Sequence, residues 1–92
     1  MKWTQEEAIA FECARECITD MMAICSGQLA EEKASTTSNA VRVCSLETQL
    51  ARLAQERAGL RGSHTDEIAR IRASYGKVIL DYRAGHKHPV AA

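Results

Sequence analysis

The sequence predicts an all-α fold, and two observations carry that prediction. Apolar residues recur at steps of three and four along most of the chain, which is the period of a helix with one buried face. The composition contains a single proline and 46% hydrophobic residues, so it suits long helices and is too apolar for general disorder. We expect one helical domain over residues 1–84 and a flexible C-terminal tail over residues 85–92.

A first helix is expected over residues of about 4–34. Thr4 and Glu7 have the spacing of a capping box, and acidic residues in a first turn suit the positive end of the helix dipole. The helix should end at the polar run 35–39, because its Ser, Thr and Asn side chains compete with the helical backbone for hydrogen bonds. Its broad apolar face comprises Phe11, Ala14, Ile18, Met21, Met22, Cys25 and Leu29.

A second apolar stripe follows this turn and keeps its phase almost to the C-terminus. Its members are Val43, Leu46, Leu50, Leu53, Leu60, Ile68, Ile71, Tyr75, Val78 and Tyr82, with Arg57 and His64 at the two remaining places. The mean step of about 3.5 residues lies near both the coiled-coil repeat and the helical turn. We therefore expect one long helix over residues of about 39–84, folded against the first as an antiparallel hairpin.

Two glycines offer an alternative to the long helix. Gly59 and Gly62 can end one helix near residues 59–63, with Ser63 and Asp66 capping a third, which gives a three-helix arrangement. The long helix is favoured because two glycines cost only about 2 kcal/mol relative to alanine. A true break would also usually reset the phase of the stripe.

The long-helix interpretation leaves part of the stripe uncovered. At 1.5 Å per residue the first helix would be about 45 Å long and the second about 68 Å. The excess predicts an interface in a coiled-coil-like homodimer or larger bundle. That interface would consist of apolar Ile68, Ile71, Tyr75, Val78 and Tyr82, with a basic rim of Arg70, Arg72 and Arg83.

The predicted function is protein–protein interaction. The chain would self-associate and bind or modulate a partner protein, as an inhibitor or adaptor does. Small size, near-neutral charge and a helical surface also suit accessory proteins of phages and plasmids. The sequence contains no phosphate loop, nucleophile elbow or dinucleotide fingerprint, so we expect neither an enzyme nor a bound cofactor.

Four cysteines provide a metal-binding alternative. Cys13 and Cys17 are four residues apart, a spacing at which two thiolates can share Zn or Cu(I), and Cys25 and Cys44 could complete a site. The segment from Cys13 to Cys17, together with Cys25, resembles the cysteine-lined helical bundles that store copper. Such bundles carry several times more cysteines, so the favoured interpretation is buried free thiols with no metal assigned.

Charge limits the remaining classes. Twelve basic and twelve acidic residues balance, although residues 1–34 hold three basic and seven acidic side chains and residues 35–92 hold nine and five. The two parts should attract each other. Arginines of the second part could meet nucleic acid, but no helix-turn-helix or zinc-finger pattern accompanies them, so this is a second alternative. We expect a cytoplasmic protein without a membrane span or targeting segment.

Overall fold

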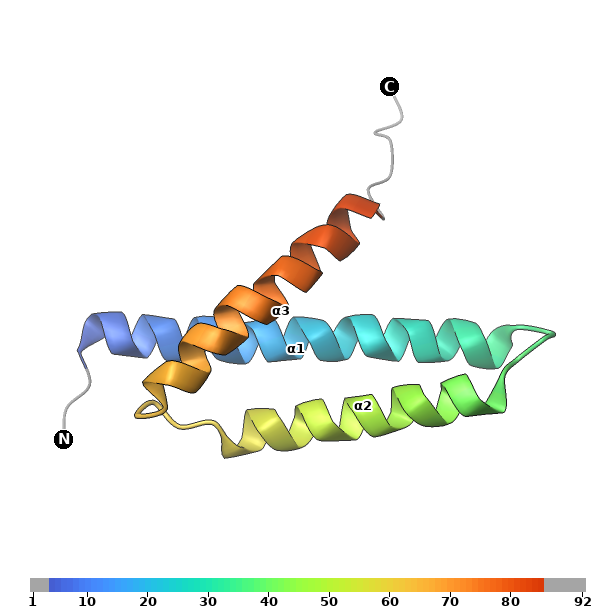
Figure 1. The fold of residues 1–92 in the computed structure, drawn as a ribbon, viewed down its shortest axis with the longest axis horizontal. Helices are drawn as coiled ribbons and strands as arrows, with labels where there is room; N and C mark the ends of the chain where they lie inside the picture. The colour runs from blue at the N-terminus through green and yellow to red at the C-terminus, as the bar shows by residue number, and fades with distance from the viewer. Residues whose placement is uncertain (1–3, 86–92) are drawn as a thin grey trace, which may run out of the picture.

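The computed structural model describes residues 4–85 and folds them into three helices (Figure 1). These are α1 (Gln5–Ala34), α2 (Ala40–Gly59) and α3 (Thr65–Gly85), and this part of the chain contains no strand. The all-α class is confirmed. Gly85, assigned to the tail by the sequence, is the last residue of α3, and the rest of the predicted tail lies outside the described residues.

The ends of α1 and the start of α2 follow from local sequence. The Glu7 amide donates to Thr4 Oγ1 and the Thr4 amide donates to Glu7 Oε1, both at 3.1 Å, so the capping box is confirmed. The predicted turn is also confirmed. Asn39 ends it as the N-cap of α2, where its Oδ1 accepts hydrogen bonds from the amides of Val41 and Arg42.

The single long helix predicted for residues 39–84 is wrong. The second helix ends at Gly59, Leu60 has extended backbone angles of φ −69° and ψ 135°, and α3 begins at Thr65. The predicted alternative, a break near residues 59–63, is therefore the correct one. Ser63 is not the residue before the third helix, although Asp66 does lie in its first turn.

Hydrogen bonds in the connector replace those that a continuous helix would have made. Arg61 Nη1 donates to the carbonyls of Ala58 and Leu60, at 3.0 and 3.2 Å, and so satisfies the end of α2. His64 Nδ1 accepts from the Arg61 amide at 3.3 Å, and its carbonyl accepts from the amide of Ile68. The break therefore costs few hydrogen bonds, while the glycines on either side of Leu60 weaken the helical alternative.

The apolar stripe keeps its phase across this break because α2 and α3 share a packing partner. Both helices pack against α1. Leu60 at the end of α2 and Ile68 in α3 belong to one buried cluster, although the connector separates them. The stripe is regular here because two helices pack on the same partner helix, and not because they form one continuous helix.

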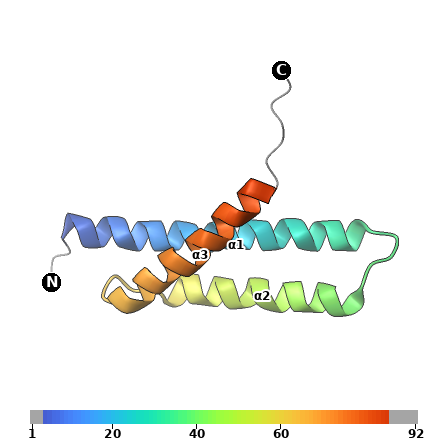
Figure 2. The ribbon, with the colours of Figure 1, turned by 45° about the horizontal axis from the view of Figure 1, so that its top comes forward.

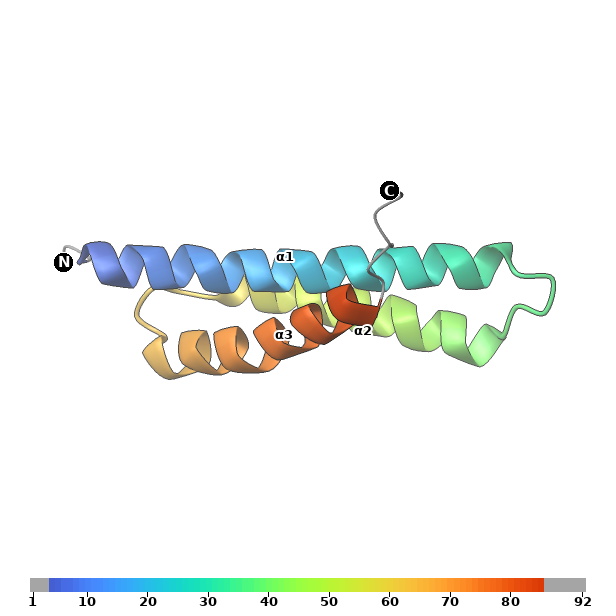
Figure 3. The same ribbon diagram turned by 90° about the horizontal axis from the view of Figure 1, so that it is seen from above.

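The three helices form an open arrangement. The helices α1 and α2 run antiparallel side by side, and α3 crosses α1 at an angle (Figures 1 and 2). From the connector, α2 and α3 diverge (Figure 1). Seen from above, they lie on one side of α1 (Figure 3). None of the described helices has the length and apolar character needed to cross a membrane.

The core sits where the three helices meet. Its buried cluster draws on every helix and on the connector: Ala14, Ile18, Leu53, Leu60, Ile68 and Ile71. Farther along α1 and α2, Cys25 and Leu46 are also buried, and the Cys25 thiol donates to the Leu46 carbonyl at 3.2 Å. In α3 the buried position near the end is Ile79, and Val78, which the stripe predicted, is 46% exposed.

Candidate interaction surface

Two residues of the predicted interface lie inside the fold of a single chain. Ile68 and Ile71 are 4% and 0% exposed, in the cluster that α3 forms with α1 and α2. The break in the long helix explains this, because it lets α3 fold back and cover its own apolar face. No second chain is needed to cover these two side chains.

The rest of the predicted apolar face lies on the side of α3 that turns toward α2. Tyr75, Val78 and Tyr82 follow one another at steps of three and four, so they share one face of α3. The Tyr75 hydroxyl donates to Glu56 Oε1 of α2 at 2.6 Å, which shows that this face turns toward α2. The helices α2 and α3 diverge from the connector (Figure 1), and Val78 on this face is 46% exposed. We call the surface formed by Tyr75, Val78 and Tyr82, together with the side of α2 that it faces, the wedge.

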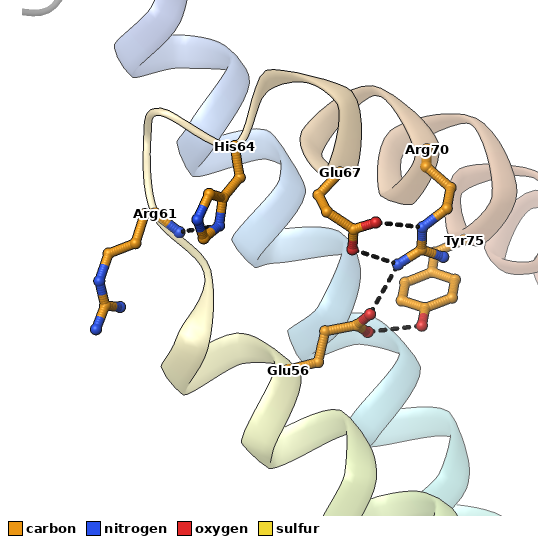
Figure 4. A network of polar contacts seen from close by, with 6 residues as sticks. All are labelled: Glu56, Arg61, His64, Glu67, Arg70 and Tyr75. Atoms are coloured by element: carbon orange, nitrogen blue, oxygen red, sulfur yellow. Dashed lines mark hydrogen bonds and ion pairs between the residues drawn. The ribbon is translucent and has the colours of Figure 1, made fainter.

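A polar network closes the narrow end of the wedge (Figure 4). Arg70 donates to both carboxylate oxygens of Glu67, at 3.1 and 2.9 Å, and to Glu56 Oε2 at 2.8 Å. Its guanidinium also lies 5.8 Å from the centre of the Tyr75 ring. Arg70, predicted as an interface residue, thus joins α2 to α3 inside the chain.

The contacts of this network stabilise the charged forms of Arg70 and Glu67 and the protonated form of Tyr75. The hydrogen bonds that Arg70 donates to Glu67 and Glu56 raise the pKa of Arg70, and the hydrogen bond from Arg70 lowers the pKa of Glu67. Burial, followed by the hydrogen bond to Glu56, raises the pKa of Tyr75. Its hydroxyl therefore stays protonated at neutral pH and remains a donor.

The other two rim residues lie on different parts of the surface. Arg83 Nη2 is 3.3 Å from Asp20 Oδ2, so it ties the end of α3 to the middle of α1. Arg72 is exposed and lines a recess beside the first turn of α1, with Glu6 and Glu7 on the same recess. The three arginines predicted as one rim thus lie apart: Arg70 contacts α2, Arg83 contacts α1, and Arg72 lines the recess between α3 and the start of α1.

The structure does not bring the four cysteines together. Cys13 and Cys17 are half-buried, Cys25 is buried and Cys44 is exposed. No group of three or more His, Cys, Asp or Glu side chains that could hold a metal ion occurs within residues 4–85. Burial, and then the carboxylate of Asp20, raises the pKa of Cys17, and burial alone raises the pKa of Cys25. Both side chains are therefore neutral thiols at pH 7, a form that binds metals poorly.

We expect the thiols of the native protein to react in the order of their exposure. Cys44 should be labelled first by a maleimide and Cys25 last, because only an accessible thiolate attacks the reagent. Timed labelling followed by peptide mass spectrometry gives the order, and Cys44→Ser should remove the fast phase alone. Equal rates for Cys25 and Cys44 in the native protein would contradict the burial of Cys25.

Sequence reasoning did not find two residues of the polar network. Glu67 and Arg70 are three apart, so their pairing had a visible helical signal. Glu56 had no such signal, because its partners Arg70 and Tyr75 lie beyond the connector. In one continuous helix they would be too far from Glu56 to make these contacts.

Comparisons of the chain with models of protein families, with curated proteins and with solved structures gave no match. The contacts, exposure and charges of the described residues are therefore what support the function proposed next.

Proposed function

We propose that the protein is a non-enzymatic helical module that binds a helix of a partner protein in the wedge, in the manner of an inhibitor or adaptor. The observation that carries the proposal is the exposure of Val78. This residue is 46% exposed and shares the face of α3 that Tyr75 turns toward α2. Half-buried Tyr75 and Tyr82 flank it one turn to either side. Aromatic side chains of this kind often anchor protein interfaces.

The opposite wall of the wedge indicates which helix would fit. Arg52 is exposed and lies one turn before Glu56, so it shares the face of α2 that meets α3. No ion pair joins Arg52 to another of the described residues. An amphipathic helix with an apolar stripe and an acidic flank would match Val78 on one wall and Arg52 on the other.

A displayed library of amphipathic helical peptides tests this proposal. The intact protein should enrich peptides with an apolar stripe and an acidic flank. In fluorescence anisotropy, Val78→Asp should weaken binding of the enriched peptides about tenfold or more, and Arg52→Glu by a smaller factor. Leu80→Asp is the matched control, because Leu80 is 67% exposed two residues after Val78, on the opposite side of α3 from the wedge, and it should bind as the wild type does.

Two results would overturn the proposal. One is a library that yields no peptide of this pattern. The other is binding by the Val78→Asp variant at wild-type strength, provided that its helical circular dichroism is unchanged. Either result would mean that the wedge does not hold a helix of the proposed chemistry.

A further inference from the structure

Among the described residues, few ion pairs join the acidic first part of the chain to the basic second part. Residues 1–34 carry a net charge of −4 and residues 35–92 a net charge of +4. Among the described residues, Asp20 and Arg83 form one ion pair in which α1 supplies the acid and a later helix the base. The ion pair between Lys33 and Glu47 also joins α1 to a later helix, but with the charges reversed. Much of the complementarity between the two parts is therefore left for contacts outside the single chain.

Glu6 and Arg72 have opposite charges, form no ion pair with another described residue, and line the same recess. This recess has a volume of about 230 Å³ and lies between the first turns of α1 and the N-terminal half of α3. Glu6 stands on the α1 wall and Arg72 on the α3 wall, and both are exposed. Between them the lining is mostly small or apolar, with Ala10, Ile68 and Ala69 among its residues.

Exposed apolar side chains lie on both helices that line this recess. Ile9 is 54% exposed on α1, next to Ala10 of the lining, and Leu80 is 67% exposed on α3. Leu80 lies eleven residues, about three turns, after Ala69, so it is on the face of α3 that begins in the recess. Gly76 lies between them on that face and has open space where a side chain would be. A second helix can therefore approach this part of α3 closely.

We infer that this surface, the α1–α3 face formed by Glu6, Ile9, Ala69, Arg72, Gly76 and Leu80, binds a second copy of the chain about a two-fold axis. In a two-fold interface every contact between two different residues occurs twice. A face that carries both signs of charge can therefore match itself, with Glu6 of each copy opposite Arg72 of the other.

This inference is independent of the proposed wedge. Arg72 and Val78 differ by six residues, which places them on different sides of α3. A dimer through the α1–α3 face would leave both wedges open, so one assembly could hold two partner helices.

Charge reversal with complementary mixing tests the dimer. Analytical ultracentrifugation of the wild-type chain should show a dimer whose dissociation constant rises between 50 and 500 mM salt, because salt screens the exposed charges. Glu6→Arg and Arg72→Glu should each weaken the dimer about tenfold or more, because each places like charges opposite one another. An equimolar mixture of the two variants should restore it, since each Arg at position 6 then faces a Glu at position 72. The mixture controls for any loss of stability caused by a single substitution.

The remaining outcomes overturn the inference. A wild-type chain that stays monomeric at 200 µM in 50 mM salt would do so, as would two reversal variants that dimerise like the wild type. Failure of the mixture to dimerise would also contradict the pairing. Val78→Asp should leave the dimer intact. If that variant alone abolished self-association, the dimer interface would be the wedge and not the α1–α3 face.

Discussion

Replacement of Ile71 by alanine is expected to lower the free energy of unfolding by about 2–5 kcal/mol. Ile71 is fully buried, at the point where α3 packs on the cluster shared by all three helices. The truncation removes apolar contacts and leaves a cavity, because helices on several sides cannot all close on the gap.

Urea unfolding followed by circular dichroism measures this loss. The matched control is Val78→Ala on the same helix, where the residue is 46% exposed and the change should stay within about 1 kcal/mol. A loss at Ile71 no greater than that at Val78 would contradict the packing of α3 on α1. The more severe Ile71→Asp should prevent folding altogether, so it tests the fold and not a dimer interface.

Removal of the hydrogen bond between Tyr75 and Glu56 is expected to cost about 1 kcal/mol, from either partner. Glu56 accepts from the Tyr75 hydroxyl at 2.6 Å and from Arg70 at 2.8 Å, and its side chain is only 23% exposed. Tyr75→Phe removes the hydroxyl alone, while Glu56→Met keeps the length of the side chain and removes both acceptor oxygens. Partial exposure keeps the expected contribution of this hydrogen bond below the range of about 1.5–3 kcal/mol that applies to charged acceptors.

A double-mutant cycle isolates this contact. The two substitutions together should cost less than the sum of the single changes, by a coupling of at least about 0.5 kcal/mol. As a control, Lys77→Ala removes an ion pair with Asp81 within α3, where the two side chains are 77% and 69% exposed. It should show no coupling to Tyr75→Phe. Strict additivity of the Glu56 and Tyr75 changes would mean that the network does not join α2 to α3.

Local signals in the sequence predicted the ends of the first helix and the start of the second. The capping box needs only Thr4 and Glu7, and the turn needs only the polar run that ends at Asn39. These features depend on residues that are neighbours in the chain. That is why they could be predicted without knowledge of what packs against what.

The break between α2 and α3 could not be decided in the same way. Leu60 and Ile68 keep the phase of the stripe because both face α1, and periodicity alone does not separate that case from one long helix. Because one long helix was predicted, the interface predicted on that helix was also partly wrong. Ile68 and Ile71 were expected to need a second chain, whereas the folded-back α3 buries them against α1 and leaves Val78 exposed.

The most direct test of the three-helix arrangement is a methyl NOE experiment on the wild-type protein. Arg57 of α2 donates to Thr19, beside Ile18. A continuous second helix would carry Ile71 about 21 Å beyond Arg57, to the start of α1 and out of reach of Ile18. The structure predicts NOEs between methyl groups of Ile18 and Ile71 that persist when labelled chains are diluted with unlabelled chains, because the contact lies within one chain. The absence of these NOEs, or their loss on dilution, would show that α3 does not fold back on its own α1.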